Sequence, residues 1–205
     1  GFLRRFRALI IRHVRRGTRF IIICGGGTTA RAYQKAAGRV IGLTRDDLDW
    51  LGIHATRLNA HLLRTIFRTF AHPRLITDPF ERVPSSKPIV IGAGWRPGCS
   101  TDYDAVLLAQ KYGAKTLINL SDIAYVFDKD PRKHRDARPL PELSWKDYRR
   151  QFGSRWHPGL SSPFDPVASK QAEKAGLRVI IAKGQDMANL DRTFRGMTFK
   201  GTVIR

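Results

Sequence analysis

The sequence predicts an α/β protein built on a mostly parallel sheet. Short apolar runs alternate with helical segments along the chain, and glycine-rich loops follow two of those runs. In a unit of strand, loop and helix, the loop lies at the carboxyl end of the strand and the amino end of the helix. Unpaired backbone N–H groups and the helix dipole favour an anion at that place. We therefore expect ligand-binding loops along one edge of the sheet.

The expected elements follow from hydrophobic periodicity and from turn residues. The first helix, residues 2–14, has an apolar face, an arginine-rich face and Gly17 as its stop. Thr44 is expected to cap a long helix that reaches Ile66, and residues 72–88 predict a connector with a short edge strand at 74–76. The expected strands are residues 19–24, 89–91, 116–120, 177–182 and 201–204. The other expected helices open in the loop 25–33, after residue 101 and at 144–147, or cover residues 167–175 and 187–195, with a loop at 156–166.

The composition limits the class of protein and its partners. The 205 residues are 42% hydrophobic and are expected to form one domain, residues 1–205. The formal net charge of +20 predicts attraction to polyanions and leaves open nucleotides, RNA or a merely solvated surface. Cys24 and Cys99 are too few for a disulfide framework, so a reducing, cytoplasmic setting is expected. No metal-ligand spacing, membrane span or signal peptide is recognisable, so we expect neither a protein-held metal nor a membrane partner.

The stretch 89–109 predicts a phosphate-binding loop between a strand and a helix. Its glycines let the backbone approach a ligand closely, its arginine adds a positive charge, and its two hydroxyl groups add hydrogen-bond donors. The residues concerned are Gly92, Gly94, Gly98, Arg96, Ser100 and Thr101. The alternative is an ordinary strand-to-helix turn in which Ser100 or Thr101 is only the helix cap.

A second glycine-rich loop, residues 25–33, also opens a helix. Gly25, Gly27 and Ala30 match a dinucleotide-binding fingerprint, which leaves a dinucleotide-dependent oxidoreductase as one alternative. The acidic residues within 46–49 start a helix instead of ending a second strand, which argues against that alternative. Neither glycine loop is a Walker motif, because no Gly-Lys-Ser/Thr follows at the required spacing.

Six motifs stand in order along the chain. They are Gly25-Gly-Gly-Thr-Thr-Ala-Arg31, Asp49-Trp-Leu-Gly-Ile-His-Ala-Thr-Arg-Leu-Asn-Ala60, Pro97-Gly-Cys-Ser-Thr-Asp102, Tyr125-Val-Phe-Asp-Lys-Asp-Pro131, Asp165-Pro-Val-Ala168 and Gly201-Thr-Val-Ile204. Over almost the whole chain this series resembles the archaeal-type uridylate (UMP) kinases of the amino-acid-kinase family. The resemblance implies a three-layer α/β/α sandwich, usually a homohexamer. It also implies transfer of the γ-phosphoryl group of Mg-ATP to UMP, which makes UDP in pyrimidine nucleotide biosynthesis.

The resemblance also implies roles for individual residues, in an acceptor half at about 1–115 and an ATP-binding half at about 116–205. The implied UMP-binding residues are Gly25, Asp49, Trp95, Arg96, Pro97, Gly98, Cys99, Ser100 and Thr101. The implied ATP-binding residues are Gly26, Arg31, Ser121, Asp122, Phe127 and Asp130. Arg31 and Asp165 are implied as catalytic, and Mg²⁺ comes with ATP. Phosphoryl transfer depends on positioning and on neutralising charge, so glycine loops, arginines and a metal suffice.

The chain departs from the family pattern mainly on the ATP side. The family begins with a strand and a Gly-Gly-Ser type loop, and nothing ahead of Gly1 supplies them. Thr28 stands where lysine is common, Asp122 where asparagine is usual and Ala124 where aspartate is usual. We therefore expect the chain to bind UMP but to transfer phosphate weakly. A second hypothesis stays open, namely a catalytically impaired kinase fold that binds RNA or a ribonucleoprotein through its basic surface.

Overall fold

The computed structural model describes all residues except 82, 85 and 154–161, and it divides the chain into two compact units. Residues 10–111 form the N-terminal unit, and residues 1–9 with 112–205 form the C-terminal unit. The first helix, α1 (Phe2–Val14), contributes to both units, with Phe6, Leu9 and Ile10 buried on its apolar face. The predicted α/β class is confirmed, because helices alternate with strands that pair largely in parallel.

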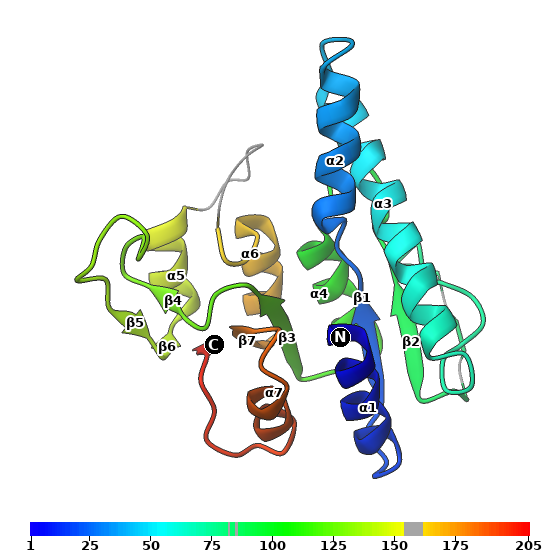
Figure 1. Cartoon of the computed structure of the whole chain (residues 1–205). Coiled ribbons are helices and arrows are strands. Elements are labelled where there is room, and N and C mark those ends of the chain that lie inside the picture. Colours follow the sequence, from blue (N-terminus) through cyan, green and yellow to red (C-terminus); the bar gives the residue numbers. More distant parts are fainter. Residues whose placement is uncertain (82, 85, 154–161) are drawn as a thin grey trace. The chain divides into compact units, whose positions relative to one another are not determined.

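The N-terminal unit contains a parallel pair of strands with helices packed against it (Figure 1). Its elements after α1 are β1 (Phe20–Ile23), α2 (Gly27–Gly38), α3 (Arg45–Ile66), β2 (Ile89–Gly92) and α4 (Thr101–Lys111). Phe20 pairs with Ile89 and Ile23 with Gly92, so the two strands end side by side. β2 is buried along its length, whereas β1 is half-buried and not fully buried as predicted. In the described part of the chain β2 is the only strand that pairs with β1.

The connector 72–88 does not contain the predicted edge strand. Residues around it form only isolated bridges, Ala71 with Ile89 and Ile76 with Gly92. The imidazole Nδ1 of His72 accepts a hydrogen bond from the Arg74 backbone N–H at 3.2 Å, which takes a donor away from any strand pairing. The prolines of the connector lack a backbone donor altogether, so a continuous ladder cannot form.

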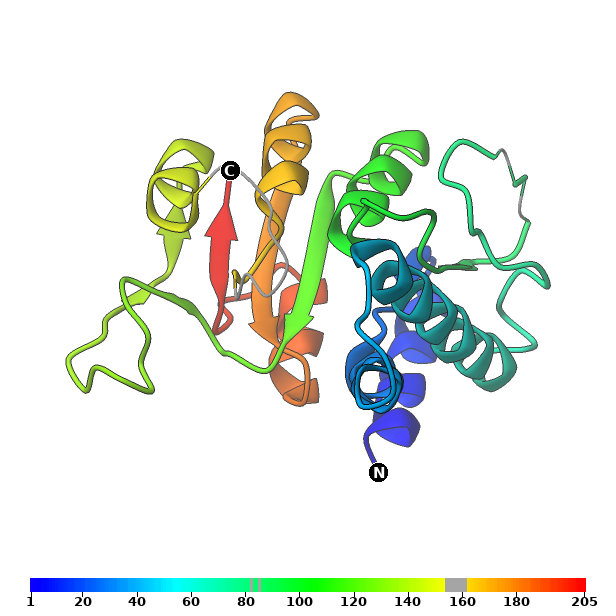
Figure 2. The same cartoon turned by 90° about the horizontal axis from the view of Figure 1, so that it is seen from above.

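The C-terminal unit is a four-stranded sheet with strand order β3-β7-β8-β6 and a separate hairpin. Its elements are β3 (Thr116–Ser121), β4 (Val126–Phe127), β5 (Pro139–Leu140), β6 (Glu142–Leu143), α5 (Trp145–Phe152), α6 (Pro166–Lys174), β7 (Arg178–Lys183), α7 (Met187–Phe194) and β8 (Thr202–Ile204). β3 and β7 pair in parallel, and β8 joins β7 in the antiparallel direction. Figures 1 and 2 show α6 and α7 on opposite faces of this sheet.

Most predicted elements of the C-terminal unit are present within a residue or two of their expected bounds. The exceptions are β4, β5 and β6, which are two residues long each and too short to show periodicity in the sequence. The loop predicted at 156–166 lies largely outside the described residues. Among the helices that are described, none has both the length and the apolar character needed to cross a membrane.

Candidate functional site

The long helix α3 organises the candidate site of the N-terminal unit. Its start is fixed by a capping box, in which the Thr44 hydroxyl accepts from the Asp47 N–H and the Asp47 carboxylate accepts from the Thr44 N–H. The Thr44 hydroxyl also donates to the Asp47 carboxylate, and this bond together with the one from the Thr44 N–H lowers the pKa of Asp47. The helix continues for 22 residues, so one rigid element reaches the loops that follow both strands. Asp49, Thr56 and Asn59, at helical spacing on α3, each bind the backbone of one of these loops.

The first loop joins β1 to α2 and is held by Asn59. The Asn59 side-chain amide donates to the Gly25 carbonyl at 2.8 Å and to the Gly26 carbonyl at 3.3 Å. A Cβ atom on Gly26 would lie 2.7 Å from the Ala30 Cβ and 3.3 Å from the Gly52 carbonyl oxygen, so this close approach requires glycine. Gly26 caps α2 without any side-chain hydrogen bond, and the first turn carries no acidic residue. The N–H groups of that turn are therefore suited to an anionic ligand.

The second loop, residues 93–100, joins β2 to α4 and is held along its length by α3. The Thr56 hydroxyl accepts from the Gly94 N–H at 2.8 Å, and the Asp49 carboxylate accepts from the Gly98 N–H at 2.8 Å. The Ser100 hydroxyl accepts from the Tyr103 N–H at 3.1 Å and thus caps α4. Ser100 therefore acts as a helix cap, as the alternative interpretation of this loop expected, while other residues set the shape of the loop.

Trp95 and Arg96 lie next to each other in the second loop, Trp95 half-buried and Arg96 exposed. The Arg96 guanidinium lies 3.9 Å from the centre of the Trp95 ring, and the Phe80 ring contacts the same indole edge-on with centroids 5.2 Å apart. Arg96 is exposed, so its charge is available to a ligand of this loop. Cys99 in the same loop is half-buried, and burial raises the pKa of its thiol. Burial raises the pKa of Cys24, below the first loop, to about 12.

The predicted ATP-binding residues of the C-terminal unit follow β3 and the β4 strand. Ser121 ends β3, and the next residue, Asp122, forms an exposed ion pair with Arg132 at 3.4 Å. Phe127 is half-buried in β4, and its carbonyl accepts from the Gln151 amide. Asp130 is exposed and accepts from the Arg132 backbone N–H at 2.9 Å. These side chains therefore belong to one exposed turn region of the C-terminal unit.

Asp165 is the N-cap of α6 and is only 7% exposed. Its carboxylate accepts from the Ala168 N–H at 2.7 Å. The preceding Phe164 is fixed by Tyr148, whose hydroxyl donates to the Phe164 carbonyl at 2.6 Å and accepts from the Phe164 N–H at 2.8 Å. These two hydrogen bonds to the Phe164 backbone give the neighbouring Asp165 a defined position, in addition to its capping role. Within the described residues, no group of three or more His, Cys, Asp or Glu side chains is arranged to hold a metal ion.

The structure brings the predicted residues together in two sets, one in each unit. The N-terminal set contains the loop residues 25–26, Arg31 on α2, Asp49 and residues 95–101, and the C-terminal set contains Ser121, Asp122, Phe127, Asp130 and Asp165. Sequence analysis did not assign Thr56, Arg57, Asn59 or Asp104 to the site, although all four bind the glycine loops. For the residues on α3, the sequence signal that could have indicated a role in the site was the spacing of polar residues along the predicted helix.

These features define an α/β protein with two glycine loops at the ends of neighbouring parallel strands, a place suited to an anionic ligand. Residues 2–183 match the amino acid kinase family. The chain is 34% identical over 199 residues to the uridylate kinase of Hyperthermus butylicus, covering 96% of this chain and 87% of that protein. It is also 34% identical over 203 residues to the uridylate kinase of Sulfolobus acidocaldarius, covering 97% and 88%.

A solved structure gives the same result. The crystal structure of uridylate kinase from Archaeoglobus fulgidus matches with a TM-score of 0.84 and 29% identity, over 99% of this chain and 92% of that one. The chain therefore belongs to the amino acid kinase family and is a kinase-type phosphotransferase. The family assignment made from the six motifs is confirmed. The RNA-binding and oxidoreductase alternatives are not favoured by these matches.

Proposed function

We propose that the chain transfers the γ-phosphoryl group of ATP, presented as its Mg²⁺ complex, to UMP and so makes UDP for pyrimidine nucleotide biosynthesis. The observation that carries the proposal is the pair of glycine loops held by α3, in a chain whose relatives are uridylate kinases. A phosphate oxygen of UMP attacks the γ-phosphorus, and ADP leaves. The protein's task is to position both nucleotides and to neutralise charge.

We assign UMP to the loops of the N-terminal unit. Arg96 and the N-terminus of α4 supply positive charge and N–H donors for the UMP phosphate. The bond from Gly98 to Asp49 indicates that Asp49 also shapes this loop, beside its predicted contact with the ribose or base. The assigned residues are Gly25, Asp49, Trp95, Arg96, Pro97, Gly98, Cys99, Ser100 and Thr101.

We assign ATP binding to the residues of the C-terminal set, and Gly26 and Arg31 keep the ATP-binding role that the family resemblance implies. Phe127 supplies a flat face for adenine, and Asp165 organises the groups around the transferred phosphoryl. Mg²⁺ enters as part of the ATP complex, and Asp122 and Asp130 keep the ATP-binding role that the family resemblance implies. The bound ion would neutralise charge on the phosphates, while the protein's residues hold the nucleotide.

The acceptor assignment is tested by UMP binding to the Arg96→Ala variant. A hydrogen bond to a charged group contributes about 1.5–3 kcal/mol, so we expect UMP affinity to fall by about 10-fold or more with an unchanged melting temperature. Arg39→Ala, which removes an exposed arginine at the end of α2, is the matched control and should leave affinity unchanged. Unchanged UMP affinity in Arg96→Ala would contradict the assignment.

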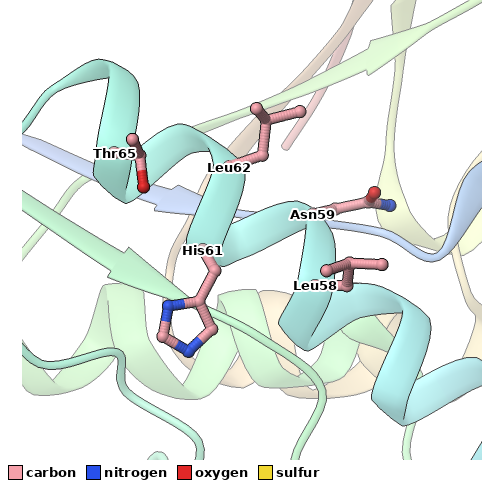
Figure 3. A pocket seen from close by; sticks show the side chains of 5 residues that line it. All are labelled: Leu58, Asn59, His61, Leu62 and Thr65. Carbon is pink, nitrogen blue, oxygen red and sulfur yellow. The ribbon is translucent and has the colours of Figure 1, made fainter.

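We also propose that the chain forms a homo-oligomer, as the family resemblance implies. The face of α3 around Leu58, His61, Leu62 and Thr65 borders an open hollow of about 430 Å³, and the two leucines are 60% and 49% exposed (Figure 3). An apolar helix face of this kind is suited to a second copy of the chain. Sedimentation should show an oligomer that Leu58→Glu with Leu62→Glu dissociates. A monomeric wild-type protein would contradict this proposal.

A further inference from the structure

Asp104 is a buried carboxylate beneath the second glycine loop. It lies in the first turns of α4 and is 1% exposed. One carboxylate oxygen accepts from the Trp95 N–H at 3.1 Å, while the other, Oδ1, is buried and has no hydrogen-bond partner in the described structure. Burial raises the pKa of Asp104 to about 6, even though the bond from Trp95 acts in the opposite direction. The ionised side chain therefore carries an energetic cost near neutral pH.

Arg57 of α3 binds Trp95 as well, at its backbone carbonyl. Its guanidinium donates to the Trp95 carbonyl at 3.2 Å, and its Nε atom is buried without a hydrogen-bond partner among the described residues. The N–H and the C=O of Trp95 are thus bound by opposite charges from two different helices. Phe80 and Arg96 fix the indole ring as well. Trp95 is therefore the anchor from which the exposed part of the loop projects.

A purely structural loop anchor would not need an ionisable group at this place. A neutral side chain could accept from the Trp95 N–H without the cost of burying a charge. Features that cost stability and lie directly at a ligand loop are expected where function requires them.

We propose that Asp104 and Arg57 are positioning residues for the acceptor nucleotide, which fix the Trp95 peptide and so aim the loop 95–100 at the UMP phosphate. The proposal rests on the function proposed above. A charged acceptor makes a stronger hydrogen bond than a neutral one, so the hold on Trp95 weakens when Asp104 takes up a proton. The strand β1 that packs against α4 carries no titratable side chain between Phe20 and Ile23. In the loop, Cys99 interacts electrostatically with Asp104, Arg96 and Asp49, and Arg57 of α3 reaches the Trp95 carbonyl.

The first arm of the test uses the protein without nucleotide. The fluorescence difference between the wild type and Trp95→Phe isolates the signal of Trp95. It should show a transition near pH 6 that is absent from the same difference measured in the Asp104→Asn background. A pH-independent Trp95 signal in the wild type would overturn the proposal. Because this arm needs no ligand, its outcome is independent of the proposed function.

The second arm measures the dissociation constant of UMP between pH 5 and pH 8. UMP itself titrates in this range, so the informative quantity is the ratio of the variant's constant to that of the wild type at each pH. For Asp104→Asn the ratio should be about 10 at pH 8 and approach 1 at pH 5, since loss of a charge-assisted bond is worth ~1.4 kcal/mol or more. For Arg57→Gln the ratio of the variant's dissociation constant to that of the wild type should be about 10 at every pH.

Asp46→Asn is the matched control, because Asp46 also lies in the first turn of a helix of this unit but is exposed. Its ratio should stay at 1. If the wild type binds UMP and the Asp104→Asn ratio is 1 at pH 8, or is the same at every pH, the proposal is overturned. If the wild type binds no UMP, the proposed function fails, and the fluorescence arm still decides whether Asp104 controls Trp95. Should Asp104→Asn not fold, Asp104→Ser serves as the same test, because it also lacks a titrating carboxylate and should likewise remove the Trp95 transition.

Discussion

The two sets of predicted site residues are held in different ways. In the N-terminal unit, polar side chains of α3 and α4 bind the backbone of both glycine loops, and two of these side chains, Thr56 and Asp104, are buried. In the C-terminal unit, Asp122 is held by an ion pair with Arg132, and the two side chains are 80% and 78% exposed. Exposed ion pairs contribute about 0–1 kcal/mol, whereas hydrogen bonds to charged groups contribute about 1.5–3 kcal/mol. The acceptor loops are therefore preorganised, and the turn region after β3 is not.

The largest expected effect concerns the charge presented by the N-terminal unit. Arg31→Ala should lower the rate of UDP formation by about 10²–10³-fold, because a positive charge that stabilises the transferred phosphoryl group is lost. Arg31 is exposed, so the melting temperature should not change. Steady-state kinetics with saturating Mg-ATP and UMP test this, with Lys35→Ala on the same helix as the control. Equal rates for Arg31→Ala and wild type would remove Arg31 from the catalytic set.

The second effect is the pH dependence of stability caused by Asp104. Its pKa is raised from 3.8 to about 6 in the folded state, so the folded protein binds more protons than the unfolded chain between these values. The free energy of unfolding should therefore fall as pH rises from about 4 to above 6, by about 3 kcal/mol from this group. Urea denaturation across this range measures the change, and Asp104→Asn should flatten the curve. An unchanged curve in the variant would show that Asp104 titrates normally.

A smaller effect is expected from two contacts made by the side-chain amides of half-buried asparagines, one in each unit. Asn59 donates to carbonyls of the first glycine loop, and Asn119 donates to the Pro163 carbonyl at 3.2 Å in the C-terminal unit. Asn59→Ala should weaken UMP binding about 10-fold, because loop carbonyls lose their partner. Asn119→Ala should leave UMP affinity unchanged. Calorimetric titration of both variants with UMP decides between a specific and a general effect, and equal losses would contradict the comparison.

The smallest effect is expected at the exposed ion pair. Arg132→Ala should change the free energy of unfolding by less than about 0.5 kcal/mol, because water and salt screen this contact. The KM for ATP should change by less than about threefold. A loss of more than 1 kcal/mol in urea denaturation would mean that the turn region after β3 is held more firmly than its exposure indicates.

The sequence predicted the elements well where periodicity and caps agree. Thr44 caps its helix as predicted, and the helix expected to open at 144–147 begins after Ser144, which caps it, because a hydroxyl before an amphipathic segment can bind the first N–H groups. The strand predicted at 74–76 is wrong, since the contact of His72 with Arg74 is a local detail that hydrophobicity does not encode. The two-residue strands β4 to β6 form through tertiary pairing alone.

The candidate site was predictable in its glycine loops but not in their supports. Gly26 is required by the approach of Ala30, and the sequence shows such a glycine directly. Thr56 and Asp104 act through contacts with residues 38 and 9 positions away along the chain, which only the folded structure brings together. Their roles can be seen only in the folded structure, because threonine and aspartate also occur on helix surfaces without such contacts.

The central claim is that the preorganised loops of the N-terminal unit select UMP as the phosphoryl acceptor. The most direct measurement is kcat/KM for UMP, CMP and AMP with saturating Mg-ATP, followed as nucleoside diphosphate formed. A site built to hydrogen-bond one base rejects others by leaving its own polar groups unpaired, so UMP should be favoured by about 10-fold or more. Equal values of kcat/KM for UMP and CMP would contradict the account.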